Sequence, residues 1–137
     1  MRFDIEDDGF FELFNVRSDL DAVRLALGSV STRFLKGPES MGFVEDYSNL
    51  DMHIYFGADS KVQGVEFFRG SSFFLQGHSI LGEAVALVLE YLEDIGELVS
   101  LNDSGFDIRN RRVRFFAPDI GEEDAVVKAV YVVACSN

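Results

Sequence analysis

The chain has 137 residues, 47% of them hydrophobic, which predicts one folded domain with a sizeable core and excludes a disordered chain. Its 12 basic and 24 acidic residues leave a net charge of −12, which disfavours nucleic acids and anionic membranes as partners because a negative surface repels phosphate groups. The single cysteine, Cys135, cannot form an internal disulfide, so nothing indicates an oxidising compartment.

Apolar residues that alternate or run between turn residues predict strands through most of the first half of the chain. The first strand is expected at Gly9–Val16. A helix should follow from Ser18, where Asp21 stands at the spacing of a capping box, to Gly28. Residues Ala58–Lys61 predict a hairpin loop. Further strands are expected at Val30–Leu35, Gly42–Tyr47, Met52–Phe56, Val62–Phe68 and Ser72–Gln76.

A second helix is expected from about Leu81 to Ile95, with Gly96 as its C-terminal stop. Its apolar stripe includes Leu87 and Val88. A tight turn is predicted at Asn110–Arg111, and the short connections indicate mainly antiparallel pairing. The last strands are expected at Phe106–Arg109, Val113–Phe116 and Ala125–Ala134.

We therefore predict an α+β fold in a single domain, 1–137, with a mainly antiparallel sheet of about eight strands and two helices. The order strand, helix, strands occurs twice, at an offset of about sixty residues. This repetition suggests two half-domains, about 9–70 and 71–135, that share one sheet. The halves match in pattern rather than in residue identity, so a chance similarity is the alternative.

We expect a cytoplasmic protein. Residues 1–8 already carry four acids, which is unlike a signal peptide. The longest strongly apolar segment, Ala84–Leu92, is interrupted by Glu90 and is too short to span a bilayer.

Most residue groupings that catalysis requires are missing. His53 and His78 have no second His or Cys at a zinc-binding spacing, and the chain has neither a P-loop nor a Gly-x-Ser-x-Gly elbow. His53 is expected on a solvated strand face and His78 in a loop or capping role, while Cys135 lies in a terminal segment of the kind that is usually mobile. We predict no catalytic residue, metal or cofactor. Glu45 and Asp46 should point to opposite faces of a strand, and a carboxylate-based enzyme stays an open alternative.

Acidic side chains gather on the outer face of the second helix, without interspersed Lys or Arg. Like charges at this spacing and acids in the last turn each destabilise a helix by tenths of a kcal/mol. Because the chain tolerates both costs, we predict that this face and a second acidic loop steer a basic protein partner; a solvated surface is the alternative. The predicted partner-binding residues are Glu90, Glu93, Asp94 and Glu97 on the helix and Glu122, Glu123 and Asp124 in the loop.

Two further charged segments stand out. Residues 6–8 are a third acidic stretch, Glu6-Asp7-Asp8. Four arginines gather in the predicted hairpin, where they are expected either to protect a sheet edge from aggregation or to pair with acids inside the protein. They are Arg109, Arg111, Arg112 and Arg114.

Five segments together are similar to those of a known family: Met52–Phe56, Val65–Phe68, Phe74–Gly77, Asp103–Phe106 and Phe115–Asp119. They resemble the immunity proteins that accompany bacterial polymorphic toxins, including those of contact-dependent inhibition. The resemblance covers residues 45–134, mostly through residues that determine the fold. It implies a cytosolic, non-enzymatic inhibitor that binds the C-terminal domain of a cognate toxin, and it assigns no binding residue. The other hypothesis of a binding protein is a non-enzymatic structural or regulatory interaction module, for which self-association through a sheet edge is one form.

Overall fold

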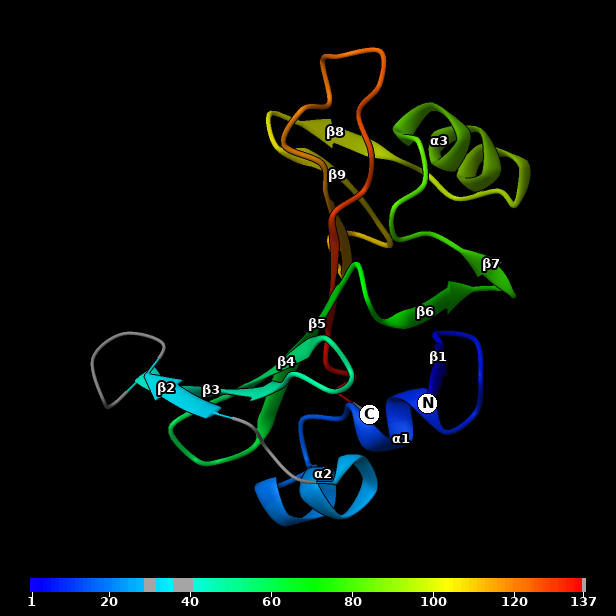
Figure 1. The fold of residues 1–137 in the computed structure, drawn as a ribbon. Helices are drawn as coiled ribbons and strands as arrows, with labels where there is room; N and C mark the ends of the chain where they lie inside the picture. Colours follow the sequence, from blue (N-terminus) through cyan, green and yellow to red (C-terminus); the bar gives the residue numbers. More distant parts are fainter. Residues whose placement is uncertain (29–31, 36–40, 137) are drawn as a thin grey trace.

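The computed structural model describes residues 1–28, 32–35 and 41–136 and confirms the α+β fold. An eight-stranded antiparallel sheet dominates the described residues, with strands in the order β2-β3-β4-β5-β11-β10-β9-β8 (Figure 1). The bounds of these strands are β2 (Thr32–Leu35), β3 (Phe43–Tyr47), β4 (Met52–Phe56), β5 (Val62–Phe68), β8 (Ser100–Asn102), β9 (Gly105–Ile108), β10 (Val113–Phe116) and β11 (Ala129–Val133).

The large sheet contains two four-stranded meanders, β2–β5 and β8–β11, whose last strands pair at its centre. Each meander follows a helix: α2 (Leu20–Leu27) precedes the first and α3 (Val85–Asp94) precedes the second. A helix followed by four strands thus occurs in both halves, although the short helix Phe10–Leu13 in the first half and the strand His78–Ser79 in the second have no counterpart. A common origin of the two half-domains stays a prediction.

The strands with the clearest alternation lie where the sequence places them. In β4, Met52, Ile54 and Phe56 are buried, while His53 and Tyr55 point to the other face. β5 and β10 also have the predicted bounds. The first two residues of the predicted strand Val30–Leu35 lie outside the described residues. The predicted tight turn between β9 and β10 has positive φ angles at three successive residues, 109–111.

The predicted strand Gly9–Val16 is wrong, because its centre forms a short helix, α1 (Phe10–Leu13). Phe10 and Phe14 are four residues apart and both are buried, as helical spacing allows. A strand would have pointed Glu12 into the core with them. Over so few residues, the helical and strand periods cannot be told apart.

Both longer helices begin later than predicted. Asp19, not Ser18, caps α2, and its side chain accepts a hydrogen bond from the Ala22 N–H at 3.0 Å. Before α3 the chain makes a turn at Leu81 and Gly82, which is held in place because Gly82 N–H donates to the Val127 carbonyl at 2.8 Å. Leu87, placed in the apolar stripe by the sequence, is exposed; the buried residues of α3 are Val85, Val88 and Leu92.

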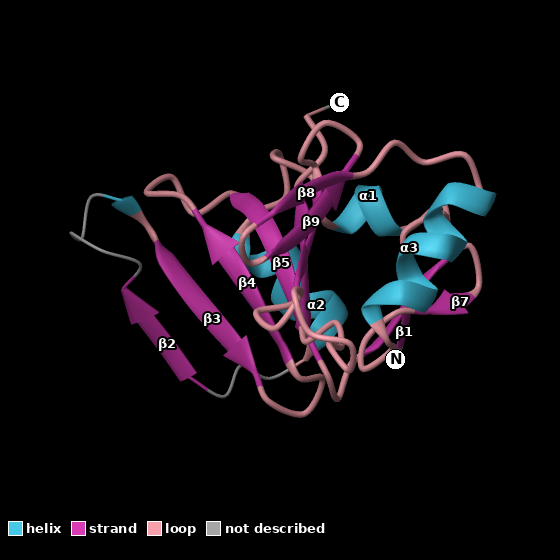
Figure 2. Ribbon diagram, turned by 90° about the horizontal axis from the view of Figure 1, so that it is seen from above, coloured by secondary structure: helices cyan, strands magenta, loops and turns pink. Residues whose placement is uncertain are grey.

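A second, three-stranded sheet was not predicted as a separate unit. It pairs β1 (Arg2–Asp4) in parallel with β6 (Ser72–Leu75), which pairs with β7 (His78–Ser79). Phenylalanine rings join the two sheets: Phe67 of β5 lies 5.3 Å from Phe3 and 4.8 Å from Phe73, measured between ring centroids. The core therefore lies on one face of the large sheet, with the helices and the small sheet (Figure 2). Within the described residues, no helix is long and apolar enough to cross a membrane.

Candidate functional site

The acidic face predicted on α3 is divided in the structure. Glu90, Glu93 and Asp94 are exposed, and none of their side chains has a hydrogen bond or ion pair within the described part of the chain. Glu97 differs, because its carboxylate pairs with Arg109 Nε at 3.2 Å and its side chain is only 15% exposed. Three of the four acids are thus available to a partner, while Glu97 is an internal link.

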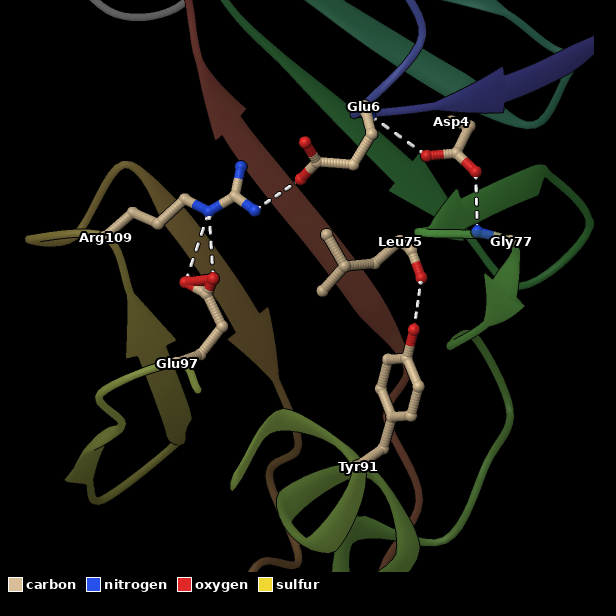
Figure 3. Close-up of polar contacts among 7 residues, drawn as sticks. All are labelled: Asp4, Glu6, Leu75, Gly77, Tyr91, Glu97 and Arg109. Carbon is tan, nitrogen blue, oxygen red and sulfur yellow. Dashed lines mark hydrogen bonds and ion pairs between the residues drawn. The ribbon is translucent and has the colours of Figure 1, made fainter. Parts of the chain in front are cut away.

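Arg109 joins three segments of the chain (Figure 3). Its guanidinium donates hydrogen bonds to Glu6 near the N-terminus and to Glu97 after α3. Burial alone would lower the pKa of Arg109, but the bonds to the two carboxylates outweigh burial and raise it. Nearby, the buried Asp4 accepts from the N–H groups of Glu6 at 3.0 Å and Gly77 at 2.7 Å. Arg109 therefore stabilises the fold by joining the N-terminal segment, the segment after α3 and its own turn.

The acidic loop Glu122–Asp124 is exposed and lies beside the N-terminal end of α3. The Val85 N–H donates to the carbonyl of Ala125, the next residue after the loop, at 2.9 Å. Acids near a helix N-terminus are favourable to its dipole, so this loop has a structural reason to be acidic. Asp94, at the other end of a helix about 15 Å long, has no such reason.

The adjacent carboxylates Glu45 and Asp46 point to opposite faces of β3, as predicted. Glu45 is fully buried and accepts hydrogen bonds from Arg24 Nε at 3.2 Å, Arg33 Nη2 at 2.9 Å and Tyr47 Oη at 3.2 Å. Burial by itself would raise the pKa of Glu45, but these bonds lower it. The charge of Glu45 is paired with Arg24 and Arg33 inside the protein and is not presented to a partner.

The two histidines and the cysteine are held by local contacts. His53 lies 3.3 Å from Asp46 on the outward face of β4, and the ring of His78 stacks on Tyr91 with centroids 4.1 Å apart. The backbone of Cys135 is paired with both neighbours of Asn15 in the chain, so this segment is fixed rather than mobile. Among the described residues, no group of His, Cys, Asp and Glu side chains could hold a metal ion.

The face of the large sheet opposite the core was not singled out by the sequence. Within the described residues, no helix or strand packs on it. The strand register brings one row of polar and charged side chains across six neighbouring strands of this face. In order from β3 to β9, the row is Asp46, His53, Glu66, Tyr131, Arg114 and Asp107.

Tyr131 lies at the centre of this open face. Its ring meets Tyr55 edge-on at 5.3 Å, and the Arg114 guanidinium lies 5.6 Å from its centroid. It also lies over Gly64, where even a Cβ atom would clash with the Tyr131 hydroxyl. The Tyr55 hydroxyl donates to Glu66 at 2.7 Å, and burial together with this carboxylate raises the pKa of Tyr55, which keeps it a donor. The central side chains are therefore packed in defined positions.

A cavity of about 560 Å³ opens on the same face, over β8 to β11. Arg111 reaches Asp107 in its wall at 3.6 Å, while Arg112 has no side-chain partner among the described residues. Tyr, Phe and Arg are the residues that concentrate in the cores of protein interfaces. Those that line the cavity include Arg111, Arg114, Phe116 and Tyr131.

Alternation along each strand could have assigned these residues to outward faces, since His53, Glu66, Arg114 and Tyr131 each stand between apolar neighbours. Only the register between strands shows that they form one row.

Comparison with known proteins gives no relative: no family model, no curated protein and no solved structure matches the chain.

Proposed function

We propose that this protein is an immunity protein of the bacterial cytoplasm, which binds the C-terminal domain of a cognate toxin and neutralises it by protein–protein contact without catalysing a reaction. The observation that supports this most is the open face of the large sheet. A polar row is usual for a sheet face in water, but this face also exposes the aromatic side chains of Phe116 and Tyr131, beside Arg114, around a cavity. Such residues give strong contacts when a partner covers them.

The charge of the molecule favours a basic protein partner over nucleic acid or a membrane. The exposed acids of α3 and of loop Glu122–Asp124 have no side-chain partner within the described residues. Such acids raise the encounter rate with a basic domain by about 10-fold or more at low salt. In this proposal, the acids accelerate encounter and the aromatic face holds the complex.

The test is co-expression with the toxin domain encoded beside this gene. Neutralisation predicts restored growth, and light scattering after size-exclusion chromatography should give a one-to-one complex. A neighbouring gene without a toxin domain, or a toxin domain that forms no complex with this protein, would contradict the proposal.

Self-association through a sheet edge is the second candidate function. It is favoured by β2, an edge strand whose four residues are all exposed, including the apolar Phe34 and Leu35. Unpaired edges of this kind can pair with a second chain. Light scattering over a range of concentrations should then show a concentration-dependent oligomer, and a constant monomer mass would exclude it.

A further inference from the structure

Strand β8 is the other edge of the large sheet, and among the described residues only β9 pairs with it. Its three residues, Ser100, Leu101 and Asn102, are all exposed. An edge strand directs half of its backbone N–H and C=O groups away from its neighbour. β8 therefore presents unpaired backbone groups to which an extended segment of another chain can add.

Two hollows meet at this edge. The cavity of the open face reaches β8 from one side, and a groove of about 310 Å³ between α3 and β8 reaches it from the other. Leu101 lines both hollows and is 66% exposed, and Leu98 in the groove is 90% exposed. A partner that covers such large, exposed apolar side chains beside an open edge removes them from water, which lowers the free energy of the complex. The other groove residues are Leu89, Glu93, Glu97 and Val99.

The charge around the groove selects the chemistry of the partner. Residues 70–108, which include α3 and β8, contain no Lys or Arg. Glu93 on the groove wall and Glu90 and Asp94 beside it are exposed acids without a side-chain partner in the described part of the chain. A second copy would bring the same acids against these, so like charges would oppose a dimer at this edge. A basic segment is attracted.

We propose that β8 is the docking edge for the partner, and that an extended segment with alternating apolar and basic side chains pairs with it as a ninth strand. Successive side chains of a strand point to opposite faces. The apolar set enters the groove against Leu98 and Leu101. The basic set points to the cavity side, where the exposed Asp103 lines the wall; Asp107 in the same wall is already paired with Arg111. The identity of the partner as a toxin domain rests on the proposed function. The preference of this edge for an apolar and basic segment does not depend on that function.

The experiment therefore has two arms, each using the full chain. In the first, two synthetic peptides of equal length, alternating Leu–Lys and Leu–Glu, are added to the ¹⁵N-labelled protein. The Leu–Lys peptide should slow amide hydrogen exchange at residues 98–102, and the Leu–Glu peptide should not. Leu98→Glu should weaken binding of the Leu–Lys peptide by about tenfold or more.

Leu25→Glu is the matched control. Leu25 is also a 90% exposed leucine, but it lies on α2, remote from β8 (Figure 1). This variant introduces the same charge and should change binding by less than about twofold. Circular dichroism of both variants should match the wild type, because neither leucine is buried. Unchanged exchange at residues 98–102, equal slowing by the Leu–Glu peptide, or equal loss in Leu25→Glu would each overturn the assignment of β8.

The second arm measures binding of the toxin domain encoded beside this gene to the same two variants. Selective loss in Leu98→Glu supports β8 as the edge that the toxin uses. A toxin domain that binds wild type and Leu98→Glu equally would refute β8 as its docking edge and leave the proposed function intact. A toxin domain that fails to bind even the wild type would refute the proposed function, while the peptides still decide the chemistry of the edge.

Discussion

Replacement of Arg109 with methionine should destabilise the protein by about 2 kcal/mol. Methionine keeps much of the side-chain volume but removes the guanidinium that binds Glu6 and Glu97. The substitution would release the N-terminal segment and the end of α3 from the turn between β9 and β10. It would also leave two carboxylates near each other without a cation.

The magnitude follows from the burial of the three side chains. Exposed ion pairs contribute about 0–1 kcal/mol, and breaking a buried pair costs about 3–5 kcal/mol. The side chains of Arg109, Glu6 and Glu97 are 30%, 41% and 15% exposed, so an intermediate loss is expected. For a domain of this length, a loss of about 2 kcal/mol corresponds to a fall in Tm of roughly 8 °C.

Urea denaturation followed by circular dichroism measures this loss. Arg112→Met is the control, because Arg112 lies next to the same turn, is exposed and has no side-chain partner among the described residues. The control should stay within about 0.5 kcal/mol of wild type. Glu97→Gln combined with Arg109→Met should lose less than the sum of the single losses. Equal stability of Arg109→Met and Arg112→Met would show that the ion pairs of Arg109 do not stabilise the fold.

Three further predictions concern pH, the open face and the acids. Because the pKa of Glu45 is lowered, its charge stabilises the fold above the unfolded value of about 4.3, and this contribution is lost as the pH falls through the folded value. Urea unfolding should therefore show a smaller acid-induced loss of stability in Glu45→Gln than in wild type; equal losses would contradict this. Gly64→Ala should displace the Tyr131 ring, which alters the near-ultraviolet circular dichroism, and should weaken the toxin complex about tenfold; an unchanged spectrum would exclude the clash. Replacing the three unpaired acids of α3 with lysine should slow toxin association at low salt without unfolding the domain, whereas Glu97 must stay because it holds Arg109; an unchanged association rate would remove this face from the encounter surface.

The strands with long, regular alternation could be predicted because their periodicity is a local property. Met52–Phe56 has the predicted bounds, since buried and outward residues alternate over all of its five positions. The segment around Phe10 and Phe14 was assigned wrongly because it is too short to separate two periods. The three-residue strand at Ser100 was missed, as nothing in so short a segment marks a strand.

Only part of the candidate site could be predicted from residues that are close together in the sequence. The sequence by itself determined the fold class, the acidity of α3 and the opposite orientations of Glu45 and Asp46, since each depends on neighbours in the chain. Only the tertiary structure shows that Glu97 forms an ion pair with Arg109. It also shows that Tyr131 lies between Glu66 and Arg114 in the sheet, and that β8 is an edge strand beside an apolar groove. Those facts depend on strand order and register, which bring together residues far apart in the chain.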